Sequence, residues 1–133
     1  MLTFLEESQR IHILIIIALY EGEIDKALAL LKSDRKPDYR YTYSYSNIDL
    51  EVARAAEETR PRAAIEIYQK EAEKSIALHE RKHYQTACSY LKKAHTLYEK
   101  LGESEQWTAY ITALRERYRS LRALKEELIK AGL

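Results

Sequence analysis

Residues 83–102 read HYQTACSYLKKAHTLYEKLG, and the spacing of their apolar side chains indicates the fold class. Its apolar side chains recur every three or four residues, at Ala87, Leu91, Ala94, Tyr98 and Leu101. This spacing places them on one face of a helix, because an α-helix turns once in about 3.6 residues. Gly102 follows, and glycine readily takes the left-handed conformation that closes a helix C-terminus. The stretch therefore predicts an amphipathic helix over about 84–101.

The same pairing of a small and a bulky residue occurs at three places along the chain. In each, an alanine follows a turn and a large side chain comes four positions later: Ala27 and Leu31, Ala64 and Tyr68, and Ala87 and Leu91. The small side chain lets two helices approach closely, and the bulky one fills the groove between them. This arrangement is typical of stacked helical hairpins, so the sequence predicts a helical-repeat protein.

Further helices are predicted on both sides of this stretch. Their expected ranges are 3–20, 23–32 and 48–58, then one starting at Pro61 and one starting at Ser104. Asn47 and Ser104 are the expected N-caps of the third and last helices. The last helix is expected to be continuous, with an apolar face at Trp107, Tyr110, Ile111, Leu114, Tyr118, Leu121, Leu124 and Leu128. We expect an all-α fold of about six helices in antiparallel pairs.

A single domain is expected over residues 1–133. It would consist of a hairpin over 3–33, a tyrosine-rich connector over 34–46 and helices over 47–133. In the connector, tyrosines alternate with Arg40, Thr42 and Ser44, at Tyr39, Tyr41, Tyr43 and Tyr45. Period two is typical of a strand, but a lone strand has no partner. The preferred interpretation is an extended connector over neighbouring helices. A short hairpin, or a strand completed by a second chain, remains an alternative.

Composition restricts the class of protein. The chain has 133 residues with 3 glycines and 2 prolines, which favours long helices over a many-turned β fold. Its formal net charge of +1 gives no overall basic field for nucleic acid. The single cysteine, Cys88, excludes an internal disulfide and a four-cysteine zinc site, and fits a cytoplasmic protein. The apolar run over residues 13–19 is too short to span a bilayer, so no membrane partner is expected.

Two family resemblances follow from these residues. Tyr84, Ala87, Leu91 and Ala94 lie where the second helix of a tetratricopeptide repeat has its aromatic, small, large and small residues, so the fold resembles a tetratricopeptide-like α-α superhelix. Over about 50–133, the segments RPRAAIEIYQKEAEKSI, HYQTACSYLKKAHTLYEKLG and EQWTAYITALRERYRSLRALKEELIKAGL resemble the C-terminal helical region of prokaryotic SWIM-type zinc-finger proteins.

The second resemblance lacks the feature that defines the family. One cysteine cannot build the C-x-C…C-x-H finger, so no zinc or DNA binding carries over to these residues. The resemblance implies either the tail of a longer protein or a family member without the finger. The first helix is apolar all round near its end, which predicts burial on more than one side and favours the first option.

Residues 79–83 read HERKH, which matches the H-E-x-x-H pattern of zinc hydrolases. That chemistry requires His79 and His83 on one face of an unbroken helix, with Glu80 as general base. Arg81 and Lys82 are unusual for such a buried helix. The repeat pattern also predicts a turn near 80–83 that separates the histidines, although a single helix over 61–101 fits the apolar spacing too. A zinc hydrolase is kept only as a remote alternative, and neither metal nor cofactor is expected.

Arg115, Arg119 and Arg122 are spaced to share one face of the expected last helix, and Lys92 and Lys93 lie on the helix before it. Together they could clamp phosphates, and the connector tyrosines with Arg40 could stack on bases. The alternative is a solvated face on which glutamates pair with the arginines.

We therefore expect a non-catalytic interaction module that binds a protein partner or associates with itself. A nucleic-acid-binding accessory module is the main rival. No enzyme activity and no small-molecule substrate are expected.

Overall fold

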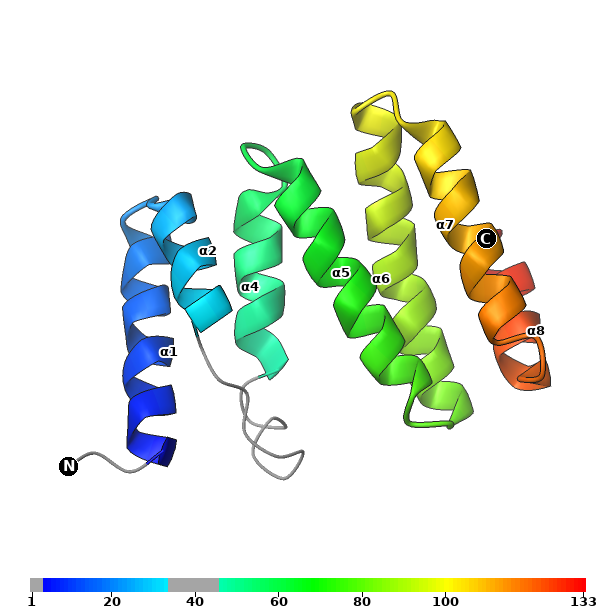
Figure 1. Ribbon diagram of the computed structural model, residues 1–133, viewed down its shortest axis with the longest axis horizontal. Coiled ribbons are helices and arrows are strands. Elements are labelled where there is room, and N and C mark those ends of the chain that lie inside the picture. Colours follow the sequence, from blue (N-terminus) through cyan, green and yellow to red (C-terminus); the bar gives the residue numbers. More distant parts are fainter. Residues whose placement is uncertain (1–3, 34–45) are drawn as a thin grey trace. The chain divides into compact units, whose positions relative to one another are not determined.

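The computed structural model describes residues 4–33 and 46–133 (Figure 1). Every regular element in these ranges is a helix, which confirms the all-α prediction. The helices are α1 (Phe4–Tyr20), α2 (Ile24–Ser33), α4 (Ser46–Ala56), α5 (Pro61–Ile76), α6 (Arg81–Lys100), α7 (Ser104–Arg117) and α8 (Arg122–Lys130). The chain divides into two compact units, Met1–Ala64 and Ile65–Leu133.

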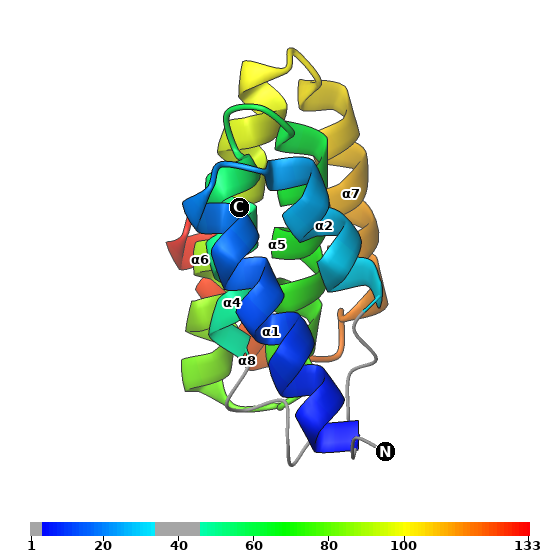
Figure 2. The same ribbon diagram turned by 90° about the vertical axis from the view of Figure 1, so that its left-hand side faces the viewer.

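The first unit is an α1–α2 hairpin against which α4 packs. Gly22 forms the hairpin turn with a φ of 78°, a value that glycine adopts without steric cost. Figure 2 shows α1 in front with α2 beside it. The buried apolar residues of this unit come from all three helices and from the start of α5: Ile15, Ala18, Ala27, Ile48, Val52, Ala53, Ala56 and Ala64. Arg60 also donates two hydrogen bonds to Asp25, at 2.8 and 2.9 Å, and so ties the end of this unit to α2.

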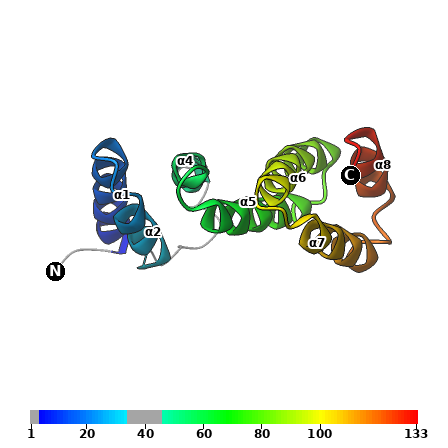
Figure 3. The same cartoon turned by 90° about the horizontal axis from the view of Figure 1, so that it is seen from above.

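The second unit contains the greater part of α5 together with α6, α7 and α8. Seen from above, α5 and α7 lie on one side of the unit, and α6 and α8 lie on the other (Figure 3). Between them lies a core of Tyr68, Ala72, Ile76, Tyr84, Ala87, Leu91, Ala94, Leu97, Trp107, Ile111, Leu114, Leu124 and Leu128. Ala87 and Leu91 are fully buried, as are Ala27 and Ala64 in the first unit, so the predicted small residues do lie at helix contacts.

Three predicted boundaries were wrong. The third helix begins at Ser46, so Asn47 lies inside it rather than capping it. Glu103, not Ser104, occupies the N-cap position of α7, and no side chain caps that helix. The expected last helix is two helices, because α7 ends at Arg117 and α8 begins at Arg122.

The break between α7 and α8 has a packing cause. Tyr118 closes α7 with a 3.1 Å backbone bond to Leu114, and Leu121 then turns back through a 2.9 Å bond to Tyr118. The reversal brings α8 against α6. Leu124 and Leu128 are thereby buried, whereas a straight continuation of α7 would carry them away from α6.

Candidate functional site

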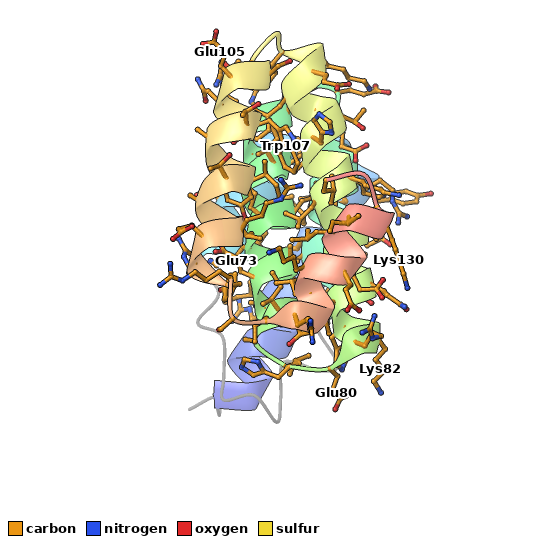
Figure 4. The ribbon with its side chains drawn as sticks, turned by 90° about the vertical axis from the view of Figure 1, so that its right-hand side faces the viewer. Glu73, Glu80, Lys82, Glu105, Trp107 and Lys130 are labelled. Atoms are coloured by element: carbon orange, nitrogen blue, oxygen red, sulfur yellow. The ribbon has the colours of Figure 1, made fainter. Side chains whose placement is uncertain are left out.

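The HERKH segment does not form a zinc site in this structure. His79 lies in the turn between α5 and α6 with a φ of 56°, and Glu80 is the extended N-cap of α6. His83 lies within the first turn of that helix, so the two histidines do not share a helix face. Glu80 and Lys82 lie at the same end of the hairpin (Figure 4). The predicted turn is confirmed, and the alternative of one helix over 61–101 is wrong.

No other described residues replace this site. Within residues 4–33 and 46–133, no group of three or more histidine, cysteine, aspartate or glutamate side chains could hold a metal ion. Glu80 instead pairs with its neighbours, at 3.6 Å from Lys82 and 3.7 Å from His83.

Arg81, the third residue of HERKH, makes the main polar contact of the second unit. Its two terminal nitrogens donate 2.8 Å hydrogen bonds to Glu126 and Glu127 of α8. These bonds lower the pKa of both carboxyl groups and raise the pKa of the guanidinium. The side chain of Glu127 is only 7% exposed, so its charge is held in a buried position by its cationic partners. Arg81, one of the two charged residues that counted against a protease helix, therefore joins the start of α6 to α8.

The three arginines predicted to share a helix face are separated by the break after α7. Arg115 lies on α7, Arg119 lies in the turn and Arg122 begins α8. All three are exposed. Arg119 donates a 3.1 Å hydrogen bond to Glu116, as the solvated-face interpretation predicts. The structure therefore does not bring them together as one phosphate clamp on a single helix.

Arg117, which no sequence pattern indicated, makes a more specific contact than these three arginines. It donates a 2.6 Å hydrogen bond to Glu73 of α5, and its guanidinium lies 5.9 Å from the centre of the Tyr118 ring. No pattern in the sequence distinguishes it from its arginine neighbours, because its partner is 44 residues away.

A hollow of about 420 Å³ lies between α6 and α8. Its walls are Gln85, Cys88, Ser89, Lys92, Glu127, Lys130 and Ala131. Burial raises the pKa of the Cys88 thiol to about 11, so the group is protonated at neutral pH and is a poor nucleophile. Glu127 lies 3.7 Å from Lys130 and also holds Arg81, so one of the wall lysines is already neutralised. The hollow therefore has the mixed polarity of a groove between two helices, and its thiol and its paired lysine are poorly suited to catalysis.

An aromatic cluster joins α6 to α7. His95 stacks on Trp107 with ring centres 4.7 Å apart, and it lies 3.0 Å from Glu99. Trp107 lies between the two helices (Figure 4). Tyr110 extends the cluster, and its buried hydroxyl has no hydrogen-bond partner within the part of the chain that the structure describes. Burial raises the pKa of that hydroxyl. The cluster therefore packs two helices together, and its phenol stays neutral.

The outer face of α1 is the most unusual surface in the described residues. Ile15 and Ala18 face the core and are 0% and 1% exposed. On the other side of the same helix, Ile13 is 57% exposed, Ile16 48%, Ile17 46% and Tyr20 94%. These four residues, which we call the outer stripe, follow the i, i+3, i+4, i+7 spacing of a helix face that normally packs against another helix. Leu14, 38% exposed, borders it. The apolar sequence pattern predicts burial on more than one side of this helix, and the structure buries only one.

The outer helix of the second unit has a different surface. The exposed residues of α8 are charged, apart from Ile129: Arg122, Lys125, Glu126 and Lys130. The exposed surface of α8 is therefore mainly charged, in contrast to the apolar outer stripe of α1.

The remaining predicted site residues, Tyr39, Arg40, Tyr41, Tyr43 and Tyr45, lie outside the described residues.

Comparison with known proteins gives one relative. Residues of this chain are 36% identical over 91 positions to YwqB, an uncharacterized protein of Bacillus subtilis (strain 168). The match covers 68% of this chain but only 17% of that protein. No known family matches the chain, and no solved structure matches it significantly. Among the described helices, none is long and apolar enough to cross a membrane.

Proposed function

We propose that the chain is a non-catalytic helical-repeat interaction module that binds a protein through the outer face of α1. The observation that carries this proposal is the outer stripe itself. Four large apolar side chains at helix-packing spacing are 46–94% exposed on a helix whose opposite face is already buried. Contiguous exposed apolar surface of this kind marks protein interaction sites in soluble proteins.

The spacing of the stripe also indicates the kind of partner. Side chains at i, i+3, i+4 and i+7 form a ridge that fits the groove of another helix. A partner that offers a helix with its own apolar stripe is therefore the best fit, and an extended strand would leave half of the ridge uncovered. Recognition of this type is a helix packed on a helix face.

The energy available sets how apolar that partner must be. Completing the burial of the three half-exposed isoleucines gives about 1 kcal/mol each, which is half the value for a fully exposed side chain. Together with Tyr20 this roughly equals the lower end of the entropy cost of association, about 4–15 kcal/mol. The partner must therefore supply a comparable apolar area of its own, which excludes purely polar ligands.

The broader setting belongs to the same proposal. We infer a cytoplasmic, tetratricopeptide-like module of the kind found at the C-terminal end of SWIM-type zinc-finger proteins. The match to 17% of the length of YwqB supports a module that occurs within longer proteins. The single, buried cysteine agrees with a reducing compartment.

Nucleic-acid binding is the rival explanation, and the geometry supports it less well. Arg119 pairs with Glu116 and Arg117 pairs with Glu73, so two basic groups near the α7–α8 turn are already neutralised. Arg115 and Arg122 lie on different helices. Binding to phosphates predicts an affinity that falls steeply with salt, whereas binding through the outer stripe predicts little dependence on salt.

The test is affinity capture from source-cell lysate with three forms of the tagged chain: wild type, Ile16→Glu and Ile129→Glu. Ile129 is 67% exposed on α8, so its substitution is a matched control for placing a charge on exposed apolar surface. Nuclease treatment and a salt series accompany each capture. We expect a protein that survives nuclease and high salt, is retained by Ile129→Glu and is lost with Ile16→Glu. Recovery that collapses with nuclease, or that is equal for all three forms, would refute binding through the outer stripe.

A further inference from the structure

We propose that the outer stripe of α1 pairs with the same stripe of a second copy, in antiparallel orientation about a two-fold axis between Ile16 and Ile17. This inference rests on the proposed function, because it names the partner of that surface. In such a pair Ile16 lies opposite Ile17 of the partner subunit, and Ile13 lies opposite the partner's Tyr20. A two-fold interface uses the same patch on both copies, so the patch must be complementary to itself.

The four side chains of the stripe are complementary to themselves in this sense. Residues 13–20 contain no charged side chain, so two copies bring no like charges together at the centre. The four stripe residues are symmetric about their midpoint, since Ile13 and Tyr20 are equally far from it. Antiparallel pairing places the larger tyrosine against an isoleucine at each end, and it avoids two tyrosines meeting at one end and two isoleucines at the other.

The charges that flank the stripe select the antiparallel orientation. Arg10 is exposed one turn before Ile13, and Glu21 and Glu23 are exposed just after Tyr20. Arg10 and Glu21 project on the same side of the stripe, because eleven residues make just over three full helical turns. Antiparallel pairing brings Arg10 of each copy to the acidic end of the other. Parallel pairing would instead bring Arg10 to the partner's Arg10 and the glutamates to glutamates.

The strength of the association depends on the net charge of the chain and on the size of the stripe. A formal net charge of +1 gives little long-range repulsion between copies. The stripe with its flanking residues has fewer members than the roughly 20–30 residues per partner of a standard stable interface. We therefore expect a reversible dimer with a dissociation constant in the micromolar range, rather than an obligate one.

The first experiment measures mass in solution. Light scattering or sedimentation over a micromolar to submillimolar concentration series should show wild type shifting from 15.6 kDa to twice that mass. Ile16→Glu, which buries an unpaired carboxylate in the pair, should weaken the dimer roughly a hundredfold. The matched control Ile129→Glu should dimerise like wild type. A wild type that stays monomeric throughout, or an Ile16→Glu variant that still dimerises normally, overturns the proposal.

The second experiment tests the orientation by disulfide formation in a Cys88→Ala background. A variant with both Ile13→Cys and Tyr20→Cys should form cross-linked dimers on mild oxidation, because the proposed pair brings these positions together. A variant with Ile13→Cys alone should stay unlinked. Efficient cross-linking of the single variant indicates parallel pairing and overturns the proposal.

The mass measurement and the capture experiment together distinguish a failure of self-pairing from a failure of the proposed function. If the protein is monomeric yet captures a different protein that Ile16→Glu loses, self-pairing fails and the proposed function stands. If the protein neither dimerises nor captures any protein through Ile16, both fail.

Discussion

Replacing His79 by glycine should stabilise the protein, because His79 has the backbone conformation of a glycine. Its φ of 56° makes it the one described non-glycine residue with a positive φ. The residue belongs to the turn that separates α5 from α6, where the backbone N–H of His79 donates a 3.1 Å bond to the carbonyl of Ile76. The side chain is exposed, so its removal leaves no cavity in the core.

The magnitude follows from two opposing effects. A side chain in the left-handed region costs about 1–2 kcal/mol, and glycine removes this cost. Glycine also gives the unfolded chain more freedom, which destabilises the folded state by about 0.4–1 kcal/mol. The balance is a gain of about 0.5–1 kcal/mol for His79→Gly. For a chain of this size it corresponds to a rise of about 2–3 °C in Tm. His79→Ala keeps the strained backbone and should gain nothing.

The assay is urea unfolding followed by circular dichroism, with wild type, His79→Gly and His79→Ala compared at the same protein concentration. The expected order of unfolding free energies is His79→Gly above wild type, and His79→Ala at or below wild type. If glycine is no better than alanine at this position, the turn does not have the left-handed geometry. In that case a left-handed residue at position 79 would not be what separates the two histidines of HERKH.

Three further predictions test the second unit. Arg81 holds the pKa of Glu126 and Glu127 below its usual value, so this contact stabilises the fold above about pH 4.5. The stability is lost as the pH falls through the lower folded-state pKa values. The free energy of unfolding should therefore depend less on acid pH in Arg81→Ala than in wild type, and an unchanged pH profile would contradict the role of this contact. Leu91→Ala should cost about 2–5 kcal/mol in chemical unfolding because the side chain is 0% exposed, while Ile129→Ala should change stability by less than about 0.5 kcal/mol. Purified wild type and a His79→Ala, His83→Ala double variant should contain equally little zinc by elemental analysis, and stoichiometric zinc in wild type that the double variant loses would restore the hydrolase hypothesis.

The sequence predicted local features well where glycine and proline interrupt the pattern. Gly22, Pro61 and Gly102 correctly located three helix ends, because each has a backbone preference that operates without tertiary contacts. The break after Arg117 has no such signal. The apolar residues keep helical spacing through it, and only the packing of α8 on α6 shows that the chain turns back.

The candidate site was predictable to a smaller extent. The apolar run over residues 13–19 indicated a helix with more than one apolar face, and the structure shows which face is covered. The arginine cluster was not correctly predicted, since its spacing argument assumed one continuous helix. The contacts of Arg81 and Arg117 connect residues more than 40 positions apart, and charge patterns within one helix do not reveal such partners.

Chemical labelling of the buried Cys88 thiol can measure local opening of the second unit. Cys88 is the single cysteine of the chain, and its pKa of about 11 keeps it unreactive toward thiol reagents near neutral pH while α6 stays packed. Cys88 lies in the wall of the hollow between α6 and α8 and is only 5% exposed, so its rate of labelling reports how readily this hollow widens toward solvent. Comparing that rate at low and high protein concentration would show whether association at α1 alters the dynamics of a helix elsewhere in the chain.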